Sequence, residues 1–179
     1  MRNRFYSEYL FIALLWTSGA QATSLSASPW SGQRLVNLEF NESALAYAQV
    51  INATFKDSSL AQNTWMQITL TNTRFENTRI VGTQSNRSEF SDVEFVDSNL
   101  SGFKCDLCRF TNSTFRKVRL DGARFLGGTF SNTQFINSDL SRADFVGVRF
   151  ESCSVDSATA KTVHPAMLKK WNLPILEQP

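Results

Sequence analysis

Residues 123–145 read ARFLGGTFSNTQFINSDLSRADF, and a large apolar residue stands at every fifth position: Phe125, Phe130, Phe135, Leu140 and Phe145. An α-helix advances by about 100° per residue, so this spacing rotates successive side chains by about 140° and gathers them on no single face. A flat strand alternates its faces every two residues, so an odd spacing would point every second side chain outward. The spacing therefore predicts a chain that turns a corner within every five residues.

The same spacing runs through most of the chain. From residue 40 to residue 155, every position divisible by five holds an apolar residue or Cys, except Ser85. We call these positions the centres. The residue two before a centre is usually small, and the two residues after it are rich in Asn, Asp, Gly and Ser, which form turns. Between residues 90 and 150 the centres are Phe or Cys except Leu100, Leu120 and Leu140, which recur every 20 residues. Four segments therefore close one turn, and residues 36–155 predict six turns of a four-sided coil, roughly 29 Å tall.

Three segments carry a recognisable motif: ARFLG at 123–127, SDLSR at 138–142 and ADFVG at 143–147 follow the pattern A(D/N)Lxx. In this motif and its unbroken register, residues 36–157 resemble the pentapeptide-repeat proteins. The resemblance implies an all-β fold, a right-handed quadrilateral β-helix, which often dimerises end to end. The sequence departs from the commonest consensus because it favours Phe over Leu at the centre and Ser or Thr over Ala before it.

The first 22 residues have the three parts of a secretory signal peptide. Arg2 and Arg4 give a positive start, an apolar run spans Tyr9–Trp16, and Ala20-Gln21-Ala22 is an A-x-A cleavage site. We expect cleavage after Ala22, export to the periplasm or the medium, and no stable membrane span afterwards. The alternative is an uncleaved anchor, although a bilayer needs about 20 apolar residues. Cleavage would lower the net charge from +2 to +1, which favours no nucleic-acid partner.

The segments that flank the repeats are expected to close the ends of the coil, because a stacked rod exposes unpaired backbone there. Residues 23–35 form an N-terminal segment in which Ser28, Pro29, Trp30 and Leu35 cover the first turn. Residues 158–179 form a C-terminal cap helix and tail. Pro165 suits the first turn of a helix over 166–171, which has Met167, Leu168 and Trp171 on one side and Lys169 and Lys170 on the other. The alternative role for this helix is a homodimer contact.

Cys105 and Cys108 occupy two inward positions, a centre and the position two before the next one. We expect them to be buried small side chains, with a disulfide between them as the alternative. Cys153 lies two turns away, roughly 10 Å along the axis, which is too far to bridge. These cysteines and His164 would not converge on a zinc ion, so no metal is expected.

No pattern in the sequence points to catalysis. We find no Gly-rich phosphate loop, no Ser–His–Asp set and no converging carboxylate pair. His164 reads as a helix-start residue. We therefore expect that the protein is not an enzyme and needs no cofactor.

Asn52, Asn72, Asn112 and Asn132 recur at the same position of their turns and so share one edge of the rod. They predict a ladder of side-chain amide hydrogen bonds between turns.

An outward apolar stripe is the candidate partner surface. Ala46, Met66, Leu126 and Val146 occupy the same position in their turns, Tyr47 and Leu107 lie beside them, and Asn86 and Asp106 interrupt the column. Exposed apolar patches can mark protein partners. The alternatives are a stripe covered by the N-terminal segment and ordinary scattered exposure.

The sequence favours an exported, non-catalytic scaffold that binds a protein or an envelope component through a face or an end of the rod. A second hypothesis comes from the resemblance, because some pentapeptide-repeat proteins mimic DNA and bind type II topoisomerases through an acidic surface. Here the outward charges are mixed, as in Arg74 with Glu76 and Arg149 with Glu151. A third hypothesis is a secreted effector that acts on another cell.

Overall fold

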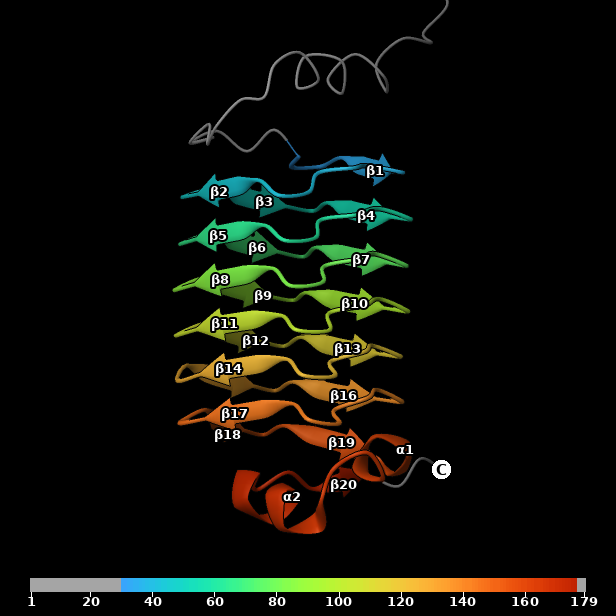
Figure 1. Ribbon diagram of the computed structural model, residues 1–179, viewed down its shortest axis with the longest axis vertical. Coiled ribbons are helices and arrows are strands. Elements are labelled where there is room, and N and C mark those ends of the chain that lie inside the picture. The colour runs from blue at the N-terminus through green and yellow to red at the C-terminus, as the bar shows by residue number, and fades with distance from the viewer. Residues whose placement is uncertain (1–29, 177–179) are drawn as a thin grey trace, which may run out of the picture.

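The computed structural model describes residues 30–176, which form a rod of stacked three-residue strands with two short helices at its C-terminal end (Figure 1). The predicted signal peptide, its cleavage site at Ala20 and Ala22, and the capping roles of Ser28 and Pro29 lie outside the described residues. No helix in the described range is long and apolar enough to cross a membrane.

Three parallel sheets make three sides of the rod, and each is named here after its first strand. The β1 face consists of β1 (Arg34–Val36), β4 (Thr54–Lys56), β7 (Arg74–Glu76), β10 (Glu94–Val96), β13 (Thr114–Arg116), β16 (Gln134–Ile136), β19 (Ser154–Asp156) and β20 (Ile175–Leu176). The β2 face consists of β2 (Ala44–Ala46), β5 (Thr64–Met66), β8 (Gln84–Asn86), β11 (Lys104–Asp106), β14 (Arg124–Leu126) and β17 (Asp144–Val146). The β3 face consists of β3 (Gln49–Ile51), β6 (Thr69–Thr71), β9 (Glu89–Ser91), β12 (Arg109–Thr111), β15 (Thr129–Ser131) and β18 (Arg149–Glu151).

The pairing register confirms the four-sided coil. Leu35 pairs with Phe55, Leu45 with Trp65 and Val50 with Leu70, a shift of 20 residues on every side. The fourth side, the bridge face, has isolated parallel bridges instead of strands, from Glu39↔Ser59 to Arg119↔Asp139. The stack has about seven turns, one more than the six predicted, because its first strand already begins at Arg34 and β19 follows the last full turn.

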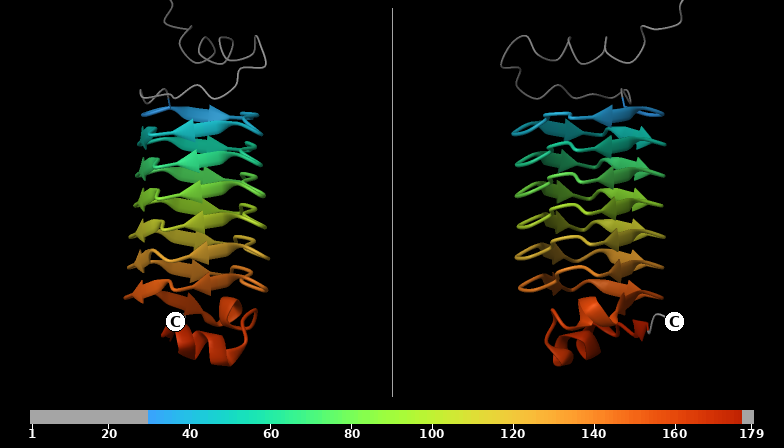
Figure 2. Two further views of the ribbon diagram at one scale, coloured as in Figure 1. Left: turned by 60° about the vertical axis from the view of Figure 1, so that its left-hand side comes forward. Right: turned by 90° about the vertical axis from the view of Figure 1, so that its right-hand side faces the viewer.

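The corners explain the five-residue spacing. In nearly every segment the second residue after the centre has a positive φ, as in Asn72 (48°), Asp97 (49°) and Gly82 (66°). This left-handed conformation is the one that Gly, Asn and Asp adopt most readily. On the three sheet faces each segment therefore consists of a three-residue strand followed by a bend, and the strands stack in columns (Figure 2). The centres are buried, apart from Leu35, Phe40 and Phe150, which are partly buried.

Stacked aromatic rings fill the core. On the β1 face, Phe55, Phe75, Phe95, Phe115 and Phe135 stack with centroids 4.9 to 5.0 Å apart. On the β3 face, Phe90, Phe110, Phe130 and Phe150 form a second column, 4.3 to 5.4 Å apart. Offset or parallel stacking of this kind adds to the free energy gained by burying each ring.

The one polar centre, Ser85, is also buried, and its neighbours in the column are Trp65 and Cys105. Ser85 pairs with Trp65 of the turn before it. The Trp65 ring and the Phe103 ring approach to 6.2 Å, although they belong to different turns. The small serine thus leaves room for Trp65 and Phe103, which explains why Phe103 is the Phe that stands outside the five-residue column.

Small hydroxyl residues before the centres satisfy backbone groups inside the rod. Ser98 Oγ donates to the Val96 carbonyl at 2.8 Å and accepts from the Thr78 N–H at 3.0 Å. Ser138 makes the same contacts with Ile136 and Val118. Buried polar groups need such partners. Because their hydroxyls are hydrogen-bonded, Ser and Thr can occupy the buried position that Ala holds in the common consensus.

The two ends of the described rod are closed differently. At the first turn, the Trp30 ring packs edge-on against Phe40 and Phe55 at 5.1 and 5.6 Å. At the last turn, α1 (Ser157–Ala160) and α2 (Pro165–Trp171) lie under the rod, and β20 pairs with β19. The predicted cap helix is confirmed, whereas α1 and β20 were not predicted.

Helix α2 begins and ends as its sequence indicates. His164 Nδ1 accepts a hydrogen bond from the Ala166 N–H at 3.2 Å, and Pro165 occupies the first helical position. Leu168 and Trp171 are buried, and the Trp171 ring lies 4.9 Å from the Phe145 ring. Asn172 ends the helix in the left-handed conformation.

Asp156 links the C-terminal helices to the rod through hydrogen bonds of its carboxylate. We expect the stability of this end to fall in acid. Its buried carboxylate accepts from the Thr159 N–H at 2.8 Å and the Asn137 N–H at 3.0 Å. Desolvation acts to raise the pKa of this carboxyl, but the hydrogen bonds outweigh it and hold the pKa below its ordinary value. The stabilisation is therefore present at neutral pH and is lost as the pH falls below about 4.

We expect Asp156→Asn to lower stability by about 1 kcal/mol at pH 7, because the neutral amide is a weaker acceptor for the Asn137 N–H. Thermal melts at pH 7 and pH 3 measure this effect, and the gap between variant and parent should narrow at pH 3. The exposed Asp144→Asn is the matched control. A gap that stays constant with pH would contradict the role given to the charge.

Candidate functional site

The register brings the six residues of the predicted partner surface onto one face. We call Ala46, Tyr47, Met66, Leu107, Leu126 and Val146 the apolar stripe. Ala46 pairs with Met66 and Leu126 with Val146 across neighbouring strands of the β2 face. Asn86 and Asp106 pair with each other between these two groups. The stripe thus has an upper part and a lower part on one side of the rod.

All large residues of the stripe are exposed, and two of them are placed by the corners. Tyr47 is 60% exposed and Leu107 is 54% exposed. Their φ angles are 57° and 56°, in the left-handed region that bulky side chains rarely adopt. A corner of this kind points its side chain away from the rod. The Leu107 side chain lies beside Gly127 of the next turn, and Tyr47 and Leu107 each occupy a position where Asn or Gly would be more stable.

The rest of the outward surface carries paired charges of both signs. On the β1 face, Lys56 binds Glu76 at 2.6 Å, and Arg74 bonds both Glu76 and Glu94. The hydrogen bonds from Lys56 and Arg74 hold the pKa of the Glu76 carboxyl below its usual range. Other pairs are Arg109–Glu89, Arg142–Asp121, Lys117–Asp97 and Arg149–Glu151. An acidic field like that of DNA would need carboxylates that are not neutralised by neighbours.

The predicted amide ladder is confirmed on the β3 face. Asn72 Nδ2 donates to Asn52 Oδ1 at 2.7 Å, and Asn132 Nδ2 donates to Asn112 Oδ1 at 3.2 Å. Asn112 in turn donates to Asp92 at 3.3 Å. These side chains bond one another, so their role is to link turns.

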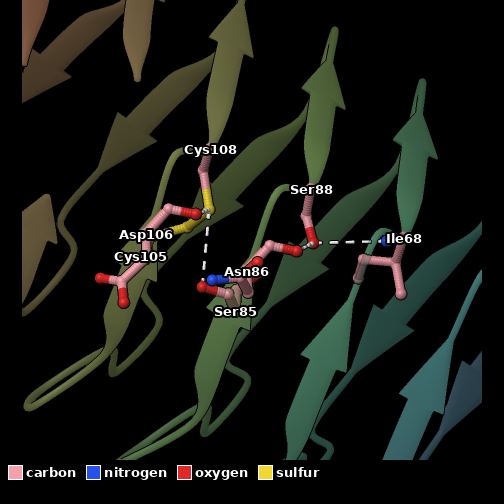
Figure 3. The surroundings of a disulfide bond; sticks show 7 residues. All are labelled: Ile68, Ser85, Asn86, Ser88, Cys105, Asp106 and Cys108. Carbon is pink, nitrogen blue, oxygen red and sulfur yellow. Dashed lines mark hydrogen bonds between the residues drawn. A yellow bond between two sulfur atoms is a disulfide. The ribbon is translucent and has the colours of Figure 1, made fainter. Parts of the chain in front are cut away.

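The structure corrects the expectation that Cys105 and Cys108 are free thiols. Cys105 and Cys108 form a disulfide, so their interpretation as two free buried thiols is wrong. Both side chains point inward from either end of one bend, and their Cα atoms are 5.7 Å apart, within the range that a disulfide needs. Figure 3 shows that Ser88 and Ile68 take the place of Cys108 in the two preceding turns. The burial that was predicted for both residues is confirmed.

We expect this disulfide to resist reductants in the folded protein. Cys105 and Cys108 are almost completely buried, and a thiolate must reach a sulfur atom to reduce it. Treatment with dithiothreitol and then iodoacetamide should add no label in native buffer, and mass spectrometry should find three labels in denaturant. The denatured sample is the control, because it shows that the same reagents reach all three cysteines once the protein is unfolded. Two labels acquired in native buffer would show that the bend opens.

Cys153 is free and buried, as predicted from its distance. Burial raises the pKa of its thiol, and Sγ donates to the Phe130 carbonyl at 3.2 Å. Within residues 30–176, no group of three or more His, Cys, Asp or Glu residues is placed to hold a metal ion.

A groove that no sequence pattern predicted lies at the C-terminal end. Its volume is about 510 Å³. One wall comes from the last turn of the rod and the other from α2 and the segment after it. The lining residues are Phe150, Ser152, Cys153, Pro165, Leu168, Lys169, Asn172, Leu173, Pro174 and Ile175.

Comparisons with known proteins agree with the repeat and the fold. Two family models, each described as pentapeptide repeats, match residues 88–127 and 110–154. A search of curated proteins finds no match.

Three similar solved structures are pentapeptide-repeat proteins or relatives of them. Rfr23 from the cyanobacterium Cyanothece 51142 is 10% identical, with 72% of this chain and 87% of that chain covered and a TM-score of 0.42. A trypsin-treated variant of QnrB1, a plasmid-mediated fluoroquinolone resistance protein, is 12% identical, with 87% and 98% covered and a TM-score of 0.30. A protein of the Arabidopsis thaliana thylakoid lumen is 20% identical, with 70% and 65% covered and a TM-score of 0.23.

Proposed function

The chain is a pentapeptide-repeat protein, and from this premise we propose that it is an exported, non-catalytic scaffold that binds a protein partner through the apolar stripe. Pentapeptide-repeat proteins are generally non-catalytic scaffolds. The proposal of export rests on the signal-peptide pattern of residues 1–22.

The observation that carries the binding proposal is the alignment of exposed apolar side chains on one face. Met66, Leu126 and Val146 are all more than one third exposed and lie in one column of the β2 face. Isolated exposed apolar residues are ordinary, but neighbouring ones, as in the two parts of the stripe, form a patch that favours association. Tyr47 and Leu107 add to this argument, because each is more than half exposed beside the column.

The charged residues beside the apolar stripe indicate which charge the partner would carry. Lys104 and Arg124 are neighbours on the same face and lie next to the lower part of the stripe. No ion pair of either residue is found among residues 30–176. A partner with an apolar ridge bordered by acidic side chains would match this surface.

Capture from the envelope fraction tests the proposal. The tagged full-length protein is expected to retain a specific partner, which Met66→Glu and Leu126→Glu should lose. Burying one unpaired carboxylate costs about 2 kcal/mol or more, which is roughly 30-fold in Kd. Gln49→Glu and Gln134→Glu add the same charge on the other two sheets and serve as matched controls. Equal capture by the stripe variants and the controls would overturn the assignment of the stripe.

The acidic-surface alternative gains no support from this geometry. Glu76 and Glu94 are bonded to Lys56 and Arg74, and the other paired carboxylates, which also have basic partners, are Glu89, Asp97, Asp121 and Glu151. We therefore do not propose a topoisomerase as the partner.

A further inference from the structure

The backbone ladder of the β3 face stops at the last turn, where a donor and an acceptor at the two ends of β18 have no further turn to pair with. Six N–H groups at successive corners, from Gly32 to Asn132, donate to the strand of the next turn, the last being Asn132 to the Glu151 carbonyl at 2.8 Å. Five carbonyls accept in the same way, the last being Gly128 from the Arg149 N–H at 3.2 Å. One turn later the equivalent groups are the Ser152 N–H and the Val148 carbonyl. Neither has a backbone partner among residues 30–176.

The chain fills the next strand position on one face and leaves it open on another. On the β1 face, β20 adds to β19 in parallel, with Val155 opposite Ile175 and the Val155 N–H donating to the Pro174 carbonyl at 3.0 Å. On the β3 face, the residues that would form the next strand, 169–171, belong to α2 instead. β18 therefore pairs only with β15 within the described chain.

The C-terminal groove lies beside this open strand. Phe150, Ser152 and Cys153 of the last turn line one wall, and Leu168 and Lys169 of α2 line the other. Its 510 Å³ lies within the range of sites that bind small ligands and short peptides. The space is therefore bounded by an unpaired strand edge on one side and by a helix on the other. Figure 1 shows β18 and α2 at this end of the rod.

The groove also continues the aromatic column. Phe90, Phe110, Phe130 and Phe150 stack in sequence, and Phe150 is the one member of the four that is only partly buried. The Trp171 ring of α2 lies 6.3 Å from Phe150 and is tilted by 41°, so it does not stack on Phe150 as the other rings of the column stack on one another. A ring supplied by a bound segment would stack on the side of Phe150 that is still exposed. Lys169 is exposed at the rim and forms no ion pair with any described residue, so it favours an acidic neighbour.

We propose that this groove binds an extended protein segment that adds to β18 as a parallel strand, with an aromatic residue at its centre and an acidic residue beside it. The segment would accept a hydrogen bond from the Ser152 N–H and donate one to the Val148 carbonyl, while its aromatic ring stacks on Phe150. Strand addition of this kind takes its affinity from backbone hydrogen bonds and its specificity from alternate side chains. This site is separate from the apolar stripe, so it does not depend on the proposed function.

A peptide copied from the rod itself is the probe. Residues 88–92, SEFSD, contain the β9 strand of the same face with Phe90 at its centre and Glu89 beside it. Acetyl-SEFSD-amide is titrated to millimolar concentration into the 15N-labelled protein. We expect a saturable downfield shift of the Ser152 amide proton and at least about tenfold slower exchange of that proton. The amide of Gly122, on the bridge face, should not change.

Three controls make the result specific. Acetyl-SEASD-amide, which lacks the ring, should bind at least about tenfold more weakly. Lys169→Glu should weaken binding of the parent peptide several-fold, whereas Lys170→Glu, on the neighbouring residue outside the groove, should not. Both variants change exposed positions of α2, and unchanged melting temperatures would confirm that they fold.

Several outcomes would overturn the proposal. One is the absence of a shift at Ser152 at millimolar peptide. Another is a set of shifts confined to the apolar stripe, or equal binding by the two lysine variants. A third is a dimer in sedimentation with the Ser152 amide already protected and no peptide bound, which would assign the groove to a second copy of the chain.

Discussion

Phe115→Ala is expected to lower the free energy of unfolding by roughly 3–5 kcal/mol, the range for truncating a buried aromatic residue. Phe115 is completely buried and stacks on Phe95 and Phe135, each at 4.9 Å. Its removal leaves a cavity in the middle of a column, where the turns above and below are tied by hydrogen bonds and cannot collapse inward. Urea unfolding monitored by circular dichroism measures the loss.

Thr114→Ala is the matched control for Phe115→Ala. Thr114 precedes Phe115 in β13 and faces outward, so its truncation should change stability by no more than about 0.5 kcal/mol. Equal losses in the two variants would contradict the inward orientation of the centres.

Gly128→Ala is expected to cost about 3 kcal/mol or more, because a Cβ atom has no room at this position. A Cβ on Gly128 would lie 2.0 Å from the Cys108 carbonyl oxygen and 3.0 Å from two further backbone atoms of Cys108. The φ of Gly128 is also positive, at 85°. The contact is with backbone, so no side-chain rotation relieves it, and the turn at residues 126–129 must shift. The same urea experiment measures the loss.

Gly122→Ala separates strain from steric clash. Gly122 has a φ of 66°, and no atom lies within 4 Å of the position that its Cβ would take. Its substitution should therefore cost only the left-handed conformation, about 1 kcal/mol. If the two alanine variants were equally stable, the close approach of Gly128 to Cys108 would not hold in solution.

The sequence predicted the architecture because the five-residue period is a property of each segment. A three-residue strand followed by a left-handed corner needs a large inward residue and a turn-forming residue, and both appear in nearly every segment from residue 40 to residue 155. The 20-residue recurrence of Leu100, Leu120 and Leu140 then gave the number of sides, because these residues stack on the bridge face.

The features that the sequence did not reveal depend on contacts between distant parts of the chain. The disulfide required knowing that Cys105 and Cys108 lean toward each other at one bend, and the pattern placed them only on the inside. β20 is a two-residue strand that exists because β19 offers it an unpaired edge. The C-terminal groove arises where α2 replaces a strand, and no local pattern encodes that space.

The candidate partner surface was predicted from the sequence only in part. The period placed the six stripe residues in register, and the structure brings them to one exposed face. Binding to a partner stays a prediction, because exposure and alignment are properties of this chain alone. The signal-peptide prediction also stays a prediction.

The distance between two spin labels tests the 20-residue turn most directly. Thr71 and Glu151 stand in one column of the β3 face, joined through Ser91, Thr111 and Ser131. Nitroxide labels on Thr71→Cys and Glu151→Cys, in a Cys153→Ala background, should lie roughly 19 Å apart with a narrow distribution, because four turns of about 4.8 Å separate them. A distance near 26 Å, as expected for roughly 15 residues per turn, or a broad distribution would contradict the four-sided coil.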